Sequence, residues 1–156
     1  MGISLGMKVK VLTRKPRTET LFLDFFDGQT VNFEITSTTD QEEFFKDVDF
    51  LSINTPKSDG YIIDAAQFEM MKDGIFIVNT ARGGVLNEVT LLQFIESGKI
   101  AGAALDVFEN EPTPELPLLM NPNLSLSPHL GGNTVDAQEK IGAELAAQII
   151  NIKNKL

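Results

Sequence analysis

The chain has 156 residues, 42% of them hydrophobic, with 22 acidic and 13 basic residues and a net charge of −9. This is enough chain for one domain with a buried core, and no apolar run approaches the roughly 18 residues of a membrane span. The acidic surface argues against nucleic acid as a partner, and the lack of cysteine excludes disulfides and thiolate-bound zinc, so we expect a cytoplasmic protein without a metal site.

Short apolar segments alternate along the chain with helical patterns, which is typical of a parallel α/β sheet. Several of these segments are apolar on both faces, which favours burial between two helix layers. The predicted strands are Val9–Thr13, Val31–Ile35, Phe50–Asn54, Ile75–Asn79, Gly102–Leu105 and Leu124–Leu126.

Residues that cap helices lie between these strands. The predicted helix starts are Thr39 with Glu42, Asp64 with Gln67, Asn87, whose helix should run to about Ser97 before Gly98, and Thr134. The last helix carries one apolar stripe, formed by Ile141, Leu145, Ile149 and Ile152. The proline-rich segment Thr113–Asn123 is predicted to be a loop.

Three motifs follow one another in the second half of the chain. They are Asn79-Thr80-Ala81-Arg82-Gly83-Gly84, then Ala101 to Phe108 followed by Glu111-Pro112, and then Ser127-Pro128-His129-Leu130-Gly131-Gly132. In order and spacing they resemble the arginine, glutamate and histidine motifs of the D-2-hydroxyacid dehydrogenases, closest to the D-3-phosphoglycerate dehydrogenase and glyoxylate/hydroxypyruvate reductase branches. The resemblance runs from about Leu5 to the C-terminus.

The resemblance implies catalytic roles that suit the side chains. Oxidation of a 2-hydroxy acid needs a base for the hydroxyl proton, a cation for the carboxylate and a nicotinamide placed for hydride transfer. Arg82 would grip the carboxylate, His129 would carry the proton, and Glu111 would orient the imidazole and favour its protonated form. Taken singly, each residue also fits an ordinary loop or turn. The motifs together favour shared ancestry, not activity of this chain by itself.

The resemblance also implies cofactor contacts. Asp106 would meet the carboxamide end of the nicotinamide, and Thr80 with Ala81 would approach the cofactor through the backbone. The segment Asn54-Thr55-Pro56 would lie where a strand meets the cofactor. Gly131 and Gly132 would let the chain pass close to the nicotinamide, although glycine there can equally serve only the turn.

The end of the first predicted strand departs from the family pattern. Relatives that prefer NAD carry an acidic residue there, which binds the ribose hydroxyls. In this chain the position is Thr13, followed by Arg14 and Lys15. These cations would suit the 2′-phosphate of NADP, or they are simply solvated charges. The expected cofactor is therefore NAD or NADP, and this chain alone need not bind either.

A second departure concerns the phosphate-binding turn. A dinucleotide-binding sheet opens with a strand, a G-x-G-x-x-G turn and a helix, and no such motif exists in these residues. We therefore expect residues 1–156 to form one partial NAD(P)-binding, Rossmann-like domain that lacks its first, central strand, with no substrate-binding domain. The gap would close to a flavodoxin-like 2-1-3-4-5 strand order, or a second copy in a homodimer would complete the sheet.

Three functions remain open at this point. By descent the chain is an oxidoreductase that moves hydride between a nicotinamide cofactor and a small D-2-hydroxy acid, and we expect it to be inactive alone. It is otherwise a non-catalytic truncated or engineered half-domain. The third alternative is a flavodoxin-like phosphate or small-molecule binder that uses the loops at residues 13–18 and 54–60.

Overall fold

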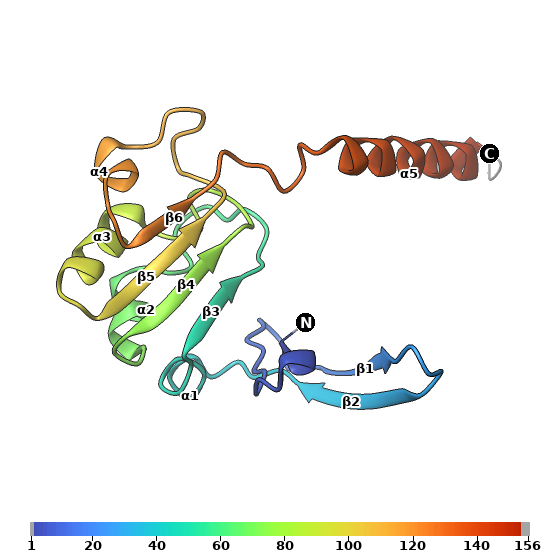
Figure 1. Ribbon diagram of the computed structural model, residues 1–156, viewed down its shortest axis with the longest axis horizontal. Coiled ribbons are helices and arrows are strands. Elements are labelled where there is room, and N and C mark those ends of the chain that lie inside the picture. The colour runs from blue at the N-terminus through green and yellow to red at the C-terminus, as the bar shows by residue number, and fades with distance from the viewer. Residues whose placement is uncertain (1, 154–156) are drawn as a thin grey trace.

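The computed structural model describes residues 2–153 and centres on a parallel sheet of four strands (Figure 1). The strands lie side by side in chain order, as β3 (Phe50–Ile53), β4 (Ile75–Asn79), β5 (Ile100–Leu105) and β6 (Leu124–Leu126). All three pairs are parallel. The prediction of an α/β domain with strands in these segments is confirmed.

Helices connect the strands and begin at residues that cap them. The connecting helices are α1 (Gln41–Phe45), α2 (Ala65–Met70), α3 (Glu88–Glu96) and α4 (Leu116–Leu119). The caps predicted at Asp64 and Asn87 are confirmed. The cap predicted at Thr39 is wrong by one residue, because Asp40 accepts a hydrogen bond from the amide of Glu43 at 3.0 Å and starts α1.

The segment Thr113–Asn123 contains the short helix α4, so the prediction of a loop throughout is wrong there. Pro117 stands in its first turn, where proline is tolerated because the amide would have no helical partner. Leu118 is fully buried and attaches α4 to the core. Pro117 thus lies within a helical turn instead of preventing one.

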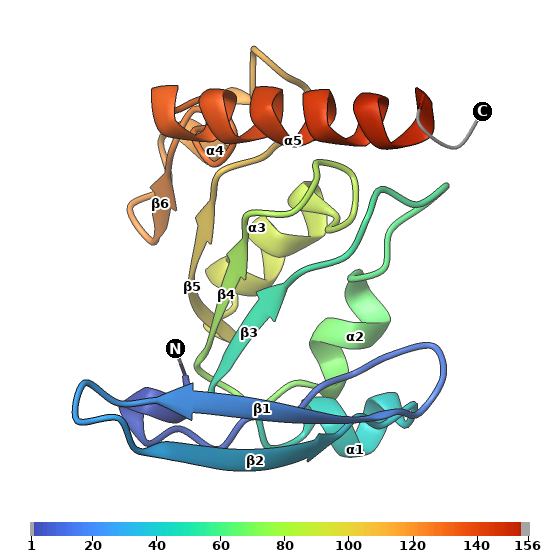
Figure 2. The ribbon, with the colours of Figure 1, turned by 90° about the vertical axis from the view of Figure 1, so that its right-hand side faces the viewer.

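The hydrophobic core lies on one face of the sheet. Figure 2 shows α2 and α3 on the same side of β3, β4 and β5. In β3, Leu51 and Ile53 are buried while Phe50 is exposed, and its ring stacks on that of Phe76 across the open face at 5.7 Å. The predicted second helix layer is therefore not found among the described residues.

The N-terminal part of the chain does not join this sheet. After a short 3-10 helix, Ile3–Leu5, the strands β1 (Thr18–Asp24) and β2 (Thr30–Thr36) form an antiparallel hairpin. The strand predicted at Val31–Ile35 lies within β2, but the strand predicted at Val9–Thr13 is not formed. In that segment only Leu12 makes an isolated bridge, to Thr38.

The predicted closure to a 2-1-3-4-5 order is wrong for this structure, because the parallel sheet begins at β3. A parallel partner for residues 9–13 would require a long crossover, whereas β1 and β2 need only a short turn. Gly28 supplies that turn with a φ of 83°. The strand-forming residues 18–36 have no central strand beside them, so they pair with each other as a hairpin.

The last helix, α5 (Val135–Lys153), begins where predicted, since the hydroxyl of Thr134 accepts the amide of Ala137 at 3.2 Å. It extends as a separate rod beside the sheet (Figure 1). No residue of α5 is buried. The predicted apolar stripe is exposed by 47–65% at Ile141, Leu145, Ile149 and Ile152.

None of the helices in residues 2–153 has both the length and the hydropathy needed to cross a membrane. Over the same residues, no three acidic or histidine side chains come together as metal ligands would.

Candidate active site

The residues of the three motifs meet at the carboxyl edge of the parallel sheet. Asn79 ends β4, Asp106 follows β5 and Ser127 follows β6. The amide of Asp106 donates to the carbonyl of Asn79 at 3.0 Å, and the amide of Ser127 donates to the carbonyl of Leu105 at 3.0 Å. This edge is where open α/β sheets place their ligands.

Asp106 holds the histidine motif in place. Its Oδ1 accepts the hydroxyl of Ser127 at 2.6 Å and the amide of Leu130 at 2.8 Å, while Oδ2 accepts the amide of Gly131 at 3.0 Å. Burial acts to raise the pKa of Asp106, but these hydrogen bonds and the charge of His129 outweigh it and lower the pKa below its ordinary value. Asp106 is therefore an ionised carboxylate that braces the turn around His129.

His129 and Glu111 form a direct pair. The Nδ1 atom of His129 lies 2.8 Å from Oε2 of Glu111, and Oε1 of Glu111 accepts the amide of Phe108 at 2.9 Å. The hydrogen bond to His129, and then that from Phe108, lower the pKa of Glu111. A carboxylate at Nδ1 fixes the tautomer of the ring and supports a positive charge on it. Within residues 2–153 the other ring nitrogen, Nε2, has no hydrogen-bond partner.

The backbone of His129 is left-handed, with a φ of 53°. Such a conformation costs energy for a residue with a Cβ atom, and it persists when surrounding contacts hold it. Asn133 supplies one contact, because its Nδ2 donates to the carbonyl of His129 at 2.8 Å. The ring of His129 is thus placed by the fold and not by a flexible loop alone.

Arg82 stands in a turn that Asn79 organises. The buried side chain of Asn79 accepts the amide of Ala81 at 3.1 Å and donates to the carbonyl of Arg82 at 3.2 Å. Gly83 packs so closely on the glutamate motif that an added Cβ would lie 1.7 Å from the carbonyl oxygen of Phe108. The guanidinium of Arg82 is exposed and donates to the carbonyl of Ala81 at 2.6 Å.

A pocket of about 590 Å³ opens beside the histidine pair. His129, Glu111, Ser127 and Asn133 supply its polar groups, and its apolar wall consists of Phe108, Pro112, Pro114, Leu119, Leu126 and Pro128. Arg82 does not line this pocket. The structure therefore joins His129 to Glu111 and brings the turn of Arg82 against Phe108, but it leaves the guanidinium outside the pocket.

Among the expected cofactor residues, Thr55 stands out because its Oγ1 is buried without a hydrogen-bond partner. Asn54, the first residue after β3, donates to the hydroxyl of Ser52 at 3.0 Å, and Pro56 follows Thr55. An unpaired buried hydroxyl costs free energy, so this atom is suited to a ligand.

The glycines of the histidine motif make ordinary turn contacts. An added Cβ at Gly131 would lie 3.3 Å from Oδ2 of Asp106, a tight but adjustable contact. The carbonyl of Gly132 accepts Gln138 Nε2 at 2.7 Å, and an added Cβ there would meet nothing. Thr80 remains exposed beside Ala81.

The loop that carries Thr13, Arg14 and Lys15 lies apart from the residues of the three motifs. Thr13 pairs through its backbone with Thr38, and its hydroxyl lies 2.7 Å from that of Ser37. Arg14 and Lys15 are exposed and lead into β1. Figure 2 shows β1 and β2 at the end of the sheet where β3 begins, opposite the edge that carries the motifs.

Sequence reasoning missed two residues of the site as functional positions. Asn79 is the polar end of a buried strand, and that change from apolar to polar was a usable signal. Ser127 stands at the start of the histidine motif, but nothing in the sequence indicated that its hydroxyl would bind Asp106. The first could be predicted and the second depends on tertiary contact.

Comparisons with known proteins agree with this arrangement. The family model for the D-isomer specific 2-hydroxyacid dehydrogenase NAD binding domain matches residues 3–131. The chain belongs to this family. A solved D-mandelate dehydrogenase of Rhodotorula graminis is similar in structure, with a TM-score of 0.63 at 34% identity over 66% of this chain and 30% of that chain, which agrees with a partial Rossmann-like sheet.

Curated relatives support the same family. The chain is 44% identical over 115 residues to a hydroxypyruvate reductase of Thermotoga maritima, over 70% of this chain and 38% of the relative. It is 41% identical over 111 residues to a D-3-phosphoglycerate dehydrogenase of Archaeoglobus fulgidus, over 69% of this chain and 21% of the relative. The chain therefore spans less than half the length of either.

A solved structure from Sinorhizobium meliloti, an NADPH-dependent glyoxylate/hydroxypyruvate reductase in complex with NADP and malonate, is also similar. Its TM-score is 0.70 at 28% identity, over 85% of this chain and 38% of that chain. The cofactor of the family is accordingly a nicotinamide dinucleotide, NAD or NADP.

Proposed function

We propose that this chain supplies the proton-transfer residues and the nicotinamide side of a D-2-hydroxyacid dehydrogenase site, in which hydride moves between NAD(P) and a small D-2-hydroxy acid. The observation that carries the proposal is the 2.8 Å pair of His129 and Glu111 beside an open pocket. Its position at the carboxyl edge of a parallel sheet agrees with the family match.

The residues divide the proton chemistry between them. In the reductive direction His129 would give a proton from Nε2 to the carbonyl oxygen of the 2-oxo acid, and it would take it back in oxidation. Glu111 binds Nδ1 and orients the ring so that Nε2 is left for the substrate. Asp106 braces the backbone that carries His129. A bound nicotinamide would supply or accept the hydride.

The cofactor residues fit one part of the dinucleotide better than the rest. The free Oγ1 of Thr55 and the Asn79-ordered turn at Thr80 and Ala81 are suited to hold it at the sheet edge. The sequence contains no G-x-G-x-x-G turn for the pyrophosphate. We infer that the nicotinamide half binds weakly and that the chain alone does not turn over substrate.

Arg82 would hold the substrate carboxylate with its planar fork. Its guanidinium now contacts the carbonyl of Ala81, so binding would require it to leave that contact. Arg14 and Lys15 would meet a 2′-phosphate only if their loop approached the carboxyl edge. The structure places that loop beside Thr38 instead.

The experiment is an NMR titration of the chain with reduced nicotinamide mononucleotide and, separately, with NADPH. We expect chemical shift changes at Thr55, Ala81 and His129 with both ligands. The two affinities should agree within about tenfold, because a chain without the G-x-G-x-x-G turn gains little binding energy from the pyrophosphate of NADPH. A response confined to Arg14 and Lys15, or none at millimolar ligand, would overturn the proposal.

A non-catalytic role for residues 1–156 by themselves is the second candidate, and the position of the Arg82 guanidinium outside the pocket of His129 favours it. It predicts the same fold and the same His129–Glu111 pair without any response to reduced nicotinamide mononucleotide. A flavodoxin-like binder lacks its structural basis, because the closed strand order on which it would depend is not formed.

A further inference from the structure

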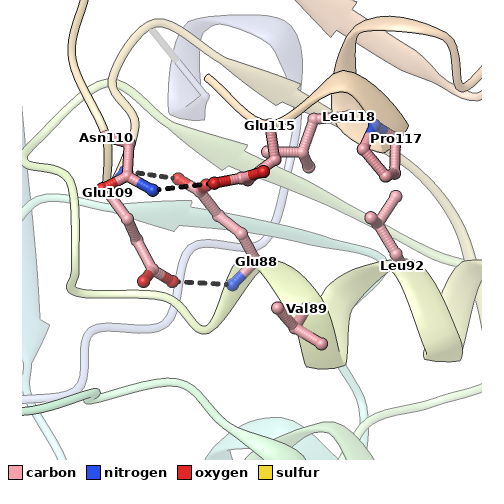
Figure 3. A pocket seen from close by; sticks show the side chains of 8 residues that line it. All are labelled: Glu88, Val89, Leu92, Glu109, Asn110, Glu115, Pro117 and Leu118. Atoms are coloured by element: carbon pink, nitrogen blue, oxygen red, sulfur yellow. Dashed lines mark hydrogen bonds between the residues drawn. The ribbon is translucent and has the colours of Figure 1, made fainter. Parts of the chain in front are cut away.

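A second pocket, of about 320 Å³, lies between the start of α3, α4 and the segment Val107–Pro112, which we call the glutamate loop. Figure 3 shows three glutamate side chains in it, on one side of an apolar wall. Its lining residues are Glu88, Val89, Leu92, Glu109, Asn110, Glu115, Pro117 and Leu118. The proton-transfer scheme above uses none of these residues.

Glu88 and Glu109 bind each other's backbone in both directions. The amide of Glu109 donates to Oε1 of Glu88 at 2.7 Å, and the amide of Glu88 donates to Oε1 of Glu109 at 3.1 Å. The hydroxyl of Tyr61 donates to the other oxygen of Glu109 at 2.9 Å. We call the two reciprocal bonds the Glu88–Glu109 clasp (Figure 3).

The burial of Glu88 distinguishes the clasp from an ordinary surface contact. Glu88 is only 6% exposed although it is an acidic residue, and burial of a carboxyl group is costly unless hydrogen bonds compensate it. Val89, the next residue of α3, is exposed, so an acidic side chain at that position would have kept its carboxylate in solvent at little cost. A buried Glu88 aimed at the glutamate loop is therefore a specific contact between two motifs.

The clasp acts on the residue next to the proton-transfer pair. The amide of Glu109 is held by Glu88, and the preceding amide, that of Phe108, is held by Oε1 of Glu111. The other oxygen of Glu111 binds His129. Two consecutive amides of the glutamate loop are thus fixed, one from α3 and one from the carboxylate that orients the imidazole.

We propose that Glu88 and Glu109 are positioning residues, whose clasp sets the glutamate loop so that Glu111 reaches Nδ1 of His129. The catalytic meaning of this role rests on the proposed function, whereas the geometry does not. Neither residue touches substrate in this scheme. Both act through Glu111.

The charges around Glu88 give the clasp a pH dependence. Burial, opposed by the hydrogen bond from the amide of Glu109, acts together with the nearby carboxylates of Glu109, Glu111 and Glu115 to raise the pKa of Glu88 to about 7. Tyr61 also faces the cluster, and its own pKa is raised, first by its hydrogen bond to Glu109. Above neutrality Glu88 is an anion, and its bond to the Glu109 amide becomes charge-assisted and stronger.

The test compares Glu88→Ala with Glu88→Gln in the whole chain. Glutamine keeps an oxygen that can accept the Glu109 amide, whereas alanine does not. We expect the Phe108 and Glu109 amides to exchange with solvent at least about tenfold faster in Glu88→Ala, as loss of one charged hydrogen bond predicts, and near wild-type rates in Glu88→Gln. The Nδ1 proton signal of His129 should weaken only in Glu88→Ala.

The matched control is Glu115→Gln, which lies in the same pocket but outside the clasp and should leave His129 unchanged. Between pH 6 and 8 the Glu109 amide shift should follow a titration in the wild type and in Glu115→Gln, and stay flat in Glu88→Gln. A folded Glu88→Ala with an unchanged His129 signal overturns the proposal, as does an equal effect of Glu115→Gln.

If Glu88→Ala does not fold, Tyr61→Phe decides, because it removes only the hydroxyl that holds Glu109. It should speed Glu109 amide exchange about threefold, and wild-type exchange would count against the clasp. Failure of the proposed function gives a different result from failure of the clasp. In that case reduced nicotinamide mononucleotide does not bind the wild type, although Glu88→Ala still disturbs His129.

Discussion

The part of the chain from β3 to β6 and the two ends of the chain are built differently. Between Phe50 and His129 the strands pair in parallel, bury one face and bring three motifs to one edge. The hairpin and α5 have regular backbone structure but few buried side chains; Phe26 is fully exposed and no residue of α5 is buried.

This contrast separates secondary structure from tertiary stability. The sequence of α5 has a clear apolar stripe, yet the stripe meets nothing among the described residues. The sequence of β4 has no greater regularity, yet Ile75 and Ile77 are fully buried. Regular hydrogen bonds therefore form in both regions, whereas burial is concentrated in the sheet.

The largest expected effect separates the core from the hairpin. Phe68 is completely buried and Phe26 is completely exposed. Phe68→Ala should lower the free energy of unfolding by about 4 kcal/mol, because it leaves a cavity, while Phe26→Ala should change it by under about 0.5 kcal/mol. Urea unfolding followed by circular dichroism measures both. Similar losses for the two variants would contradict the contrast.

A second pair compares glycines in the two regions. An added Cβ at Gly83 would collide with the backbone of Phe108, whereas one at Gly142 in α5 meets nothing. Gly83→Ala should cost about 3 kcal/mol through overpacking. Gly142→Ala should add roughly 0.5–1 kcal/mol of helix stability, since alanine favours the helix. Thermal unfolding and helical circular dichroism distinguish them, and a neutral Gly83→Ala would show that the arginine turn can move freely.

The third effect is a pH dependence inside the sheet region. The pKa of Glu88 is raised from 4.5 to about 7 in the folded protein, so the folded state binds the proton more tightly than the unfolded chain does. Its ionisation therefore destabilises the fold progressively as pH rises from the unfolded pKa toward 7, by about 3 kcal/mol in total.

Glu88→Gln removes this titration. The difference in unfolding free energy between the wild type and Glu88→Gln should therefore shift by about 3 kcal/mol between pH 4.5 and 8, in favour of the variant at high pH. Urea unfolding across that range measures it, with Glu115→Gln as the control. A constant difference would mean that Glu88 titrates at its ordinary value.

The sequence indicated the residues of the candidate site more accurately than the elements that lie around them. Arg82, Glu111 and His129 were singled out, and the structure joins the last two directly. It does not bring Arg82 into their pocket, because the guanidinium is bound to the carbonyl of Ala81. Thr13, Arg14 and Lys15 were expected beside the cofactor and instead lie by Thr38 and β1, since their predicted strand has no neighbour in the sheet.

The sequence by itself determined the four strands of the parallel sheet, the caps at Asp64, Asn87 and Thr134, and the order of the three motifs, because these depend on neighbours a few residues apart. Only the tertiary structure decided that Asp106 would brace His129, that Glu88 and Glu109 would clasp each other, and that residues 18–36 would fold back as a hairpin. These outcomes depend on contacts between distant segments and on which strand is present to pair, and local sequence patterns contain neither.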